Sequence, residues 1–385
     1  MKTKNCTGCL ACYNICPTDS ITLITNSEGF IYPQKNLTSC VNCGLCEKTC
    51  PIITPHSINK TLTPTAFAGI NKNEKIRTES SIGGIFTAIA EKIINNGGFV
   101  FGAKFDSDFS VIHTYTDNIA GLSDFRGSKY VQSKIGNSFR ECKKLLDSGR
   151  QVLFSGTPCQ IGGLKNYLQT DYQNLITVDL ICHGAPSPLL WQKYIHSQSA
   201  NREISRINFR DKSCGWKNYS VALYFSNNQV EKKVFHNHEY MKLFLKNVCL
   251  RSSCYNCDFK GINRISDITL ADFWGIQHEF PELDDNKGTS FVIAQTHKGK
   301  EIICSLDNCI MEEIPLEKGA KYNPPLVKSV DCPISRTSFF TDMITESLTI
   351  KQLAAKYAAT PFLLRLKKII KRYSAKLLKI VRRKK

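Results

Sequence analysis

The chain has 385 residues, of which 42% are hydrophobic, and this composition excludes a largely disordered protein. It contains no run of about eighteen apolar residues that could span a membrane, and its first residues, with Lys2, Lys4 and then cysteines, do not resemble a secretory signal. The net charge of +18 would suit a nucleic-acid-binding protein, but thirteen Lys and Arg and no acidic residue lie from Ser347 to Lys385, which leaves +5 for the rest. We therefore expect a cytoplasmic protein in a reducing compartment, with a basic tail and no specific nucleic-acid partner.

Two cysteine motifs with the same spacing lie near the start of the chain. The first is CTGCLACYNICP, with Cys6, Cys9, Cys12 and Cys16, and the second is CVNCGLCEKTCP, with Cys40, Cys43, Cys46 and Cys50. This spacing is that of bacterial two-cluster ferredoxins, in which three cysteines of a motif bind one 4Fe-4S cluster and the fourth binds the other. The rule predicts a first cluster on Cys6, Cys9, Cys12 and Cys50 and a second on Cys40, Cys43, Cys46 and Cys16. A zinc site needs only four thiolates, and disulfides between such close cysteines would be strained, so both alternatives are disfavoured.

The elements that follow alternate between strands and helices. Residues 1–55 are predicted to form the dicluster ferredoxin domain, and residues 56–65, rich in Pro, Ser, Thr and Asn, a linker. In chain order we then expect a helix in SIGGIFTAIAEKIINNGG, a hairpin of FVFGAKFD and SVIHTYT, a helix in NSFRECKKLLDSG, and the series strand QVLFSG, helix TPCQIGGLKNYLQ and strand LITVDLICHG. This order predicts a parallel, buried sheet, whereas YSVALYFSNNQVEKKVF predicts an antiparallel hairpin. The fold class is therefore mixed α/β, with a small ferredoxin domain followed by a larger α/β domain over residues 66–345.

Two glycine-containing turns that begin helices are candidates for binding phosphate. FSGTPCQIGGLK joins a buried strand to a helix through Ser155, Gly156 and Thr157, and SSIGGIF begins another helix at Gly83 and Gly84. The free amides of a helix N-terminus favour phosphate oxygens. Neither stretch is a complete dinucleotide or nucleotide motif, so an ordinary turn remains the alternative for both.

A further group of cysteines predicts a third cluster. CLRSSCYNCDFK contains Cys249, Cys254 and Cys257, and the fourth ligand is Cys182 or Cys159, with Cys182 favoured. A zinc site completed by a histidine such as His183, or simple packing, are the alternatives. The remaining five cysteines show no pairing and are assigned to packing: Cys142, Cys214, Cys304, Cys309 and Cys332.

DITLADFWGI places Asp272 and Trp274 after an apolar strand. An aromatic ring beside a carboxylate could stack on a flavin, and a strand end capped by a core tryptophan is the alternative. His113, His196, His236 and His238 belong to no recognisable constellation in the sequence.

Five motifs in their order resemble the coenzyme F420 hydrogenase/dehydrogenase beta-subunit family: GSKYVQS, FSGTPCQIGGLK, DLICHGAPSP, CLRSSCYNCDFK and DITLADFWGI. The resemblance extends over roughly residues 1–345 and is strongest to bacterial members found among polysaccharide-synthesis proteins. It implies bound FAD, a 4Fe-4S cluster in the large domain, and exchange of electrons with coenzyme F420 or with ferredoxin. It also implies that the FAD is lined by Ser81, Gly83, Gly84, Lys129, Tyr130, Ser155, Gly156, Thr157 and Gln160, and the flavin pocket flanked by Asp272 and Trp274.

These features predict an oxidoreductase that uses FAD and 4Fe-4S clusters, with a link to polysaccharide biosynthesis and a redox partner protein or small electron carrier. No catalytic acid or base is assigned. The alternative is a noncatalytic subunit that relays electrons to a separate enzyme, and a weaker one is a nucleic-acid-binding iron-sulfur protein.

Residues 346–385 form the predicted tail. TPFLLRLKKIIKRYSAKLLKIVRRKK has apolar residues at three- and four-residue steps between Lys and Arg, which predicts a basic amphipathic helix. We expect it to bind an anionic membrane on its inner face, with an acidic partner or RNA as alternatives.

Overall fold

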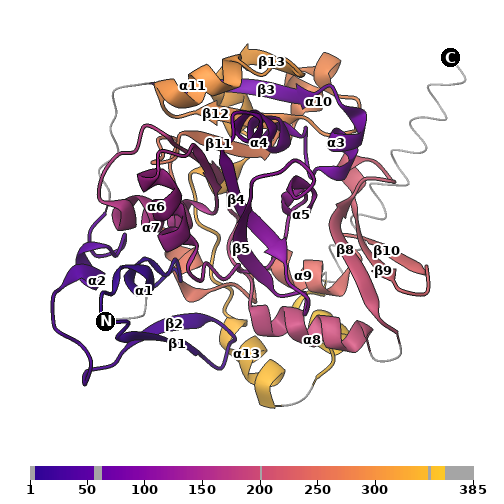
Figure 1. Cartoon of the computed structure of the whole chain (residues 1–385). Coiled ribbons are helices and arrows are strands. Elements are labelled where there is room, and N and C mark those ends of the chain that lie inside the picture. Colours follow the sequence, from indigo (N-terminus) through magenta and orange to yellow (C-terminus); the bar gives the residue numbers. More distant parts are fainter. Residues whose placement is uncertain (1–4, 56–62, 200–201, 346–347, 360–385) are drawn as a thin grey trace, which may run out of the picture.

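The computed structural model describes residues 5–55, 63–199, 202–345 and 348–359, and these form a mixed α/β fold around a large sheet (Figure 1). The sheet has eight strands in the order β13-β3-β12-β11-β7-β6-β4-β5. In chain order they are β3 (Thr65–Asn71), β4 (Phe99–Phe105), β5 (Val111–Thr116), β6 (Val152–Ser155), β7 (Leu175–Leu180), β11 (Ile268–Asp272), β12 (Ser290–Ala294) and β13 (Cys309–Ile314). The central strands β4, β6, β7 and β11 are parallel, and the outer strands pair antiparallel. The predicted mixed fold class is therefore confirmed.

Helices cover both faces of this sheet because its buried strands alternate their side chains between two cores. Leu153 packs with α4 (Ile85–Asn95), whereas Val152 and Phe154 pack with α6 (Ser138–Asp147) and α7 (Pro158–Leu168). The three helices match the predicted ones. Gly97 and Gly149 follow α4 and α6 with φ of +72° and +79°, the left-handed conformation that ends a helix.

The N-terminal domain is small and packs on the second of these faces. It consists of α1 (Ala11–Ile15), the antiparallel pair β1 (Ile21–Thr25) and β2 (Ile31–Lys35), and α2 (Leu45–Lys48). Cys9, Leu10 and Ala11 share a buried core with α6 and α7. In Figure 1 the domain, in indigo, lies beside these helices at the lower left.

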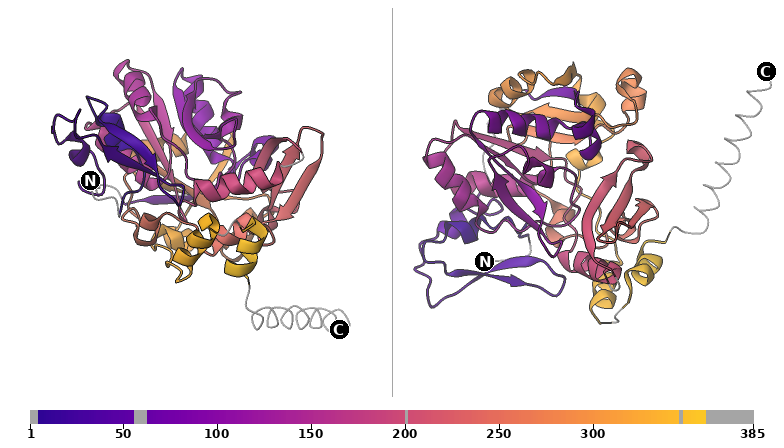
Figure 2. Two further views of the ribbon diagram at one scale, coloured as in Figure 1. Left: turned by 90° about the horizontal axis from the view of Figure 1, so that it is seen from below. Right: turned by 45° about the vertical axis from the view of Figure 1, so that its right-hand side comes forward.

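A second, three-stranded sheet lies on the other side of the molecule, as all views in Figures 1 and 2 show. It consists of β8 (Ile204–Asp211), β9 (Ser220–Phe225) and β10 (Val230–Val234), and β9 and β10 form the predicted hairpin. Asn228 in its turn has a φ of +64°. The sheet packs on α8 (Pro188–Gln198) and α9 (Glu239–Leu245) around Trp191 and Tyr240.

The remaining elements are short. They are α3 (Glu74–Glu79), α5 (Leu122–Phe125), α10 (Ile276–Glu279), α11 (His297–Cys304), α12 (Leu316–Ala320), α13 (Arg336–Thr345), α14 (Ile350–Tyr357), and the 3-10 helices η1 (Trp216–Asn218), η2 (Ser252–Asn256), η3 (Pro281–Leu283) and η4 (Pro324–Leu326). Ile350 and Leu353 of α14 are buried in the core of α8 and α9, so the packed structure continues beyond residue 345. Residues 360–385, with most of the predicted basic helix, lie outside the described residues. Within the described ranges, no helix is both long and apolar enough to cross a membrane.

The parallel strands bring three loops to one edge of the large sheet. β6, β7 and β11 end at Ser155, Leu180 and Asp272, and their registers place Ser155 opposite Val178 and Leu270 opposite Leu180. Loops at the carboxyl ends of such strands are where ligands bind in open α/β sheets.

Candidate redox site

A cavity of about 490 Å³ opens at this edge of the sheet. It is lined by ten of the eleven residues that the family resemblance implies for FAD and the flavin pocket: Ser81, Gly84, Lys129, Tyr130, Ser155, Gly156, Thr157, Gln160, Asp272 and Trp274. The exception is Gly83, which packs against β3. A Cβ at Gly83 would lie 2.3 Å from the carbonyl oxygen of Gly69, so the glycine permits close packing of two backbones.

Four cysteines line the same cavity and form what we call the central site: Cys159, Cys182, Cys254 and Cys257. Burial, together with the neighbouring Cys182 and Cys257, raises the pKa of the Cys254 thiol to about 12. Burial likewise raises the pKa of Cys159, and all three other cysteines add to this effect. Burial therefore opposes ionisation of the free thiols of Cys159, Cys182 and Cys254, and a group whose positive charge replaces their protons would offset this cost.

The structure does not place Cys249 in the central site. Its side chain is fully buried in the core around α8 and α9, and its carbonyl oxygen accepts a hydrogen bond from Ser187 N at 2.9 Å. The ligand set predicted from the sequence included Cys249. In the structure Cys159, at the start of α7, lines the cavity and Cys249 does not. The other assignments to packing hold for Cys142 and Cys309, which are buried, and fail for the exposed cysteines, which are Cys214, Cys304 and Cys332.

The eight N-terminal cysteines form two further groups. The second site is a cavity of about 230 Å³ lined by Cys16, Cys40, Cys43 and Cys46. The first site contains Cys6, Cys9, Cys12 and Cys50. There, burial, together with the neighbouring Cys6 and Cys50, raises the pKa of Cys9 to about 12.

The cysteines of the three sites are thiols that form no disulfide. All eighteen cysteines are free, and no three Cys, His, Asp or Glu side chains in the described part of the chain are arranged around one ion. A 4Fe-4S cluster is larger than one ion, so its four thiolates stand further apart around it.

The turn before α7 is built by its own side chains. The backbone N–H of Thr157 donates to Oε1 of Gln160 at 2.9 Å, and Gln160 Nε2 donates to Ser133 Oγ at 2.9 Å. His113 Nε2 lies 3.0 Å from the carbonyl oxygen of Ser155, and burial lowers the pKa of His113 to about 4. The histidine is therefore a neutral wall of the cavity, which no sequence pattern indicated.

Two basic side chains of the cavity wall, Lys129 and Arg126, have donors whose needs the described residues do not fully meet. Lys129 Nζ donates only to the carbonyl oxygens of Arg126 and Gly127, at 3.1 and 3.3 Å, and forms no ion pair with the described residues. Burial lowers its pKa to about 7, an effect that Asp124 opposes. Arg126 pairs with Glu79, but its buried Nε has no partner among the described residues. An anion in the cavity would satisfy both groups.

Arg210 joins the predicted pair of Asp272 and Trp274. Its guanidinium forms an ion pair with Asp272, donates to the Tyr130 hydroxyl at 3.2 Å, and lies 4.0 Å from the centre of the Tyr219 ring. Arg210 comes from β8, far from Asp272 in the sequence, so only the fold brings them together.

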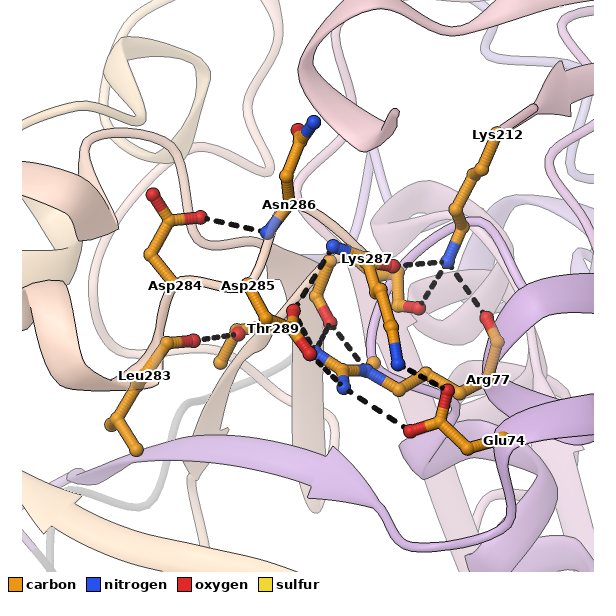
Figure 3. Close-up of polar contacts among 12 residues, drawn as sticks. Glu74, Arg77, Lys212, Leu283, Asp284, Asp285, Asn286, Lys287 and Thr289 are labelled. Atoms are coloured by element: carbon orange, nitrogen blue, oxygen red, sulfur yellow. Dashed lines mark hydrogen bonds and ion pairs between the residues drawn. The ribbon is translucent and has the colours of Figure 1, made fainter. Parts of the chain in front are cut away.

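A polar network holds the turn that carries Ser81. Figure 3 shows Arg77 and Lys212 converging on the loop 284–289. Arg77 donates to Asp285 at 2.7 Å and to Gly288 O at 2.9 Å, and Lys212 Nζ donates to the carbonyl oxygens of Arg77 and Ile82 at 2.7 Å. These bonds fix one wall of the cavity between α3 and β12.

Two segments of the chain match families of known proteins. Residues 5–52 match the family model of the 4Fe-4S dicluster domain, and residues 149–318 match the family model of the C terminus of the coenzyme F420 hydrogenase/dehydrogenase beta subunit. No curated protein matches the chain. A similar solved structure is a chain of the F420-reducing [NiFe] hydrogenase complex from Methanosarcina barkeri, studied by xenon derivatization, with a TM-score of 0.46, 15% identity, and coverage of 77% of this chain and 91% of that chain. These matches show a 4Fe-4S dicluster domain near the start of the chain and a segment, residues 149–318, that is similar to the C terminus of oxidoreductase beta subunits.

Proposed function

We propose that this protein is an iron-sulfur flavoprotein oxidoreductase that transfers electrons between coenzyme F420 or ferredoxin and an acceptor through FAD and three 4Fe-4S clusters. The observation that carries the proposal is the single cavity that contains both the central site and the anion-binding groups around Lys129. The families matched by residues 5–52 and 149–318 support it.

The residues of the cavity fit a flavin nucleotide. Lys129 has no acidic partner and the Nε of Arg126 has no acceptor among the described residues, so both would donate to phosphate oxygens. Trp274, stacked on Trp216 with ring centres 4.6 Å apart, offers an aromatic wall. When bound, a flavin supplies the conversion between electron pairs and single electrons.

The other residues of the cavity act by position and charge. The ion pair with Arg210 orients the Asp272 carboxylate, and the indole N–H of Trp216 donates to the same carboxylate at 3.1 Å. The neutral His113 adds no charge beside Ser155. None of these groups is placed to act as an acid or base without first losing its partner, so we assign binding and orientation to them.

The central and first cysteine sites meet at α7. Cys159 of the central site is in the first turn of this helix, and Gly163, four residues later, contacts Cys9 of the first site. The second site lies further out in the N-terminal domain. We infer that electrons pass between the cavity and an external partner at this domain.

Anaerobic bleaching of the flavin absorbance tests the proposal. The purified protein is mixed in turn with reduced coenzyme F420, reduced ferredoxin and NADH. Bleaching by coenzyme F420 would establish exchange with a deazaflavin, and bleaching by ferredoxin alone would point to an organic acceptor. A protein that contains no flavin would overturn the proposal.

The alternative is a noncatalytic subunit that relays electrons, and the series of three cysteine sites favours it as a second candidate. Turnover of an acceptor by the isolated chain separates the two. A role in polysaccharide biosynthesis and the binding of residues 346–385 to an anionic membrane stay proposals from the sequence. If removal of residues 360–385 releases the protein from anionic vesicles, the proposal of membrane binding is supported.

A further inference from the structure

Arg251 is a fully buried cation without an acidic partner. Its side chain is 0% exposed. Three other deeply buried arginines in the described ranges each have a carboxylate: Arg77 pairs with Asp285, Arg210 with Asp272 and Arg264 with Asp179. Arg251 takes part in no ion pair with any described residue. Because a buried, unpaired charge is strongly unfavourable, the folded protein must supply negative charge near it in another form.

The guanidinium of Arg251 is held by two carbonyl groups of the N-terminal domain and by the side chain of Gln132. Its Nε donates to the carbonyl oxygen of Cys6 at 2.7 Å, and its two other nitrogens donate to Ile31 O at 3.1 Å and to Gln132 Oε1 at 3.2 Å. It lies 4.1 Å from the centre of the Tyr32 ring. All these partners are neutral, so they satisfy its hydrogen bonds but leave its charge unbalanced.

The loop of the first site closes directly on this side chain. Gly8, between Cys6 and Cys9, has a φ of +73°, and a Cβ there would lie 2.9 Å from a guanidinium nitrogen of Arg251. Gln132 Nε2 donates to Thr7 O at 3.0 Å. The positive charge therefore lies behind the loop that carries the first cysteines of the first site.

The backbone of Arg251 belongs to the central site. Its N–H donates to Ala185 O at 2.9 Å, and its carbonyl oxygen accepts a hydrogen bond from Cys254 N at 2.9 Å. Ala185 N donates in turn to Cys254 Sγ at 3.3 Å. One residue thus joins the two cysteine sites, the first through its side chain and the central one through its backbone.

We propose that Arg251 is the shared counter-ion of the clusters in the first and central sites, and that it raises the reduction potential of both. The inference rests on the proposed function, since it needs clusters in these sites. Four thiolates make a bound cluster negative, and reduction adds a further electron, so a nearby positive charge stabilises the reduced form more than the oxidised form. Arginine keeps its charge at every working pH.

Redox titration of the anaerobic holoprotein, followed by electron paramagnetic resonance, tests this role. Arg251→Gln should lower the potentials of the first and central clusters and leave that of the second unchanged. Arg251→Lys, which keeps the charge, should restore most of the loss. The signal of the central cluster is identified as the one absent from Cys182→Ala.

Two further variants separate charge from structure. Gln132→Glu places a carboxylate against the guanidinium without removing it, and should lower the same two potentials even if Arg251→Gln fails to fold. Arg140 is the matched control, because it also binds the N-terminal domain, through Asn14 O at 2.8 Å, but is already paired with Asp19. Arg140→Gln should leave the first and central potentials unchanged.

The inference would be overturned if the reduction potentials of the first and central clusters are unchanged in Gln132→Glu and in folded Arg251→Gln. The iron content of both variants must be intact for this comparison. Failure of the proposed function looks different. A wild-type protein with about eight irons per chain, rather than about twelve, would lack the central cluster, and the shared role would fall with it.

Discussion

Gly163 lies directly against Cys9, so that a methyl group at Gly163 would be 2.9 Å from both Cβ and Sγ of that cysteine. Cys159 precedes Gly163 by four positions in α7, which places the two residues on one face of the helix, about 6 Å apart along its axis. The contact at Gly163 therefore determines how closely the first site approaches the central site.

Gly163→Ala should disturb this approach. Alanine favours the helix by about 1 kcal/mol, but the overpacking against Cys9 should cost about 1–3 kcal/mol and displace the N-terminal domain. We expect a lower thermal midpoint of the holoprotein and slower reduction of the central cluster by ferredoxin, measured by rapid-freeze paramagnetic resonance.

Gly162→Ala is the control for this change. It gains the same helix propensity, but its methyl group would meet the Phe259 ring at 2.7 Å and no cysteine of the first site. Equal electron-transfer rates in the two variants would show that the contact with Cys9 does not set the distance between the sites.

Helices and hairpins that depend on neighbouring residues could be predicted from the sequence. Contacts between residues that are distant in the sequence depend on the fold. The helix α4 and the hairpin of β9 and β10 follow from apolar periodicity and turn residues, as predicted. Cys249 is close to Cys254 in sequence, yet the chain turns it into a core, while Cys159 reaches the cavity from another strand end. The position of Cys159 at a strand end made it a candidate from the sequence, but no local pattern indicated that Cys249 is buried in the core around α8 and α9.

The identity of the central ligands gives a second prediction. Cys159→Ala should lower the iron content from about twelve to about eight per chain, because a cubane cluster normally needs all four thiolates. Cys249→Ala removes a buried sulfur that lies outside the cavity and should keep about twelve. Iron analysis of anaerobically purified protein measures both. The reverse result would return Cys249 to the ligand set.

Lys129 provides a third prediction. Lys129→Met removes the basic group that lacks an acidic partner in the cavity. It should weaken FAD binding about 10- to 100-fold, which corresponds to the free energy of one hydrogen bond to a charged group. Flavin fluorescence during dilution or titration measures the dissociation constant. Lys134→Met, five residues later and exposed, is the control. Equal affinities in both variants would remove Lys129 from the flavin site.

His238 gives a prediction on pH that is independent of any cofactor site. Its Nε2 lies 2.8 Å from the Tyr194 hydroxyl, and its Nδ1 accepts a hydrogen bond from Met241 N at 3.4 Å at the start of α9. Burial lowers the pKa of His238 from 6.5 to about 4, an effect that Glu239 opposes. The unfolded chain therefore binds more protons than the folded one between these values, and stability is lost as the pH falls from 6.5 towards 4.

His238→Asn should remove this part of the pH dependence, because asparagine also caps a helix but does not titrate. The loss in the wild type over the window is on the order of 3 kcal/mol, so the thermal midpoints of wild type and variant should converge as the pH falls from 7 to 5. Scanning calorimetry of the holoprotein measures them, with His196→Asn, an exposed position on α8, as the control. A difference in midpoint that stays constant with pH would mean that His238 is not the group that titrates.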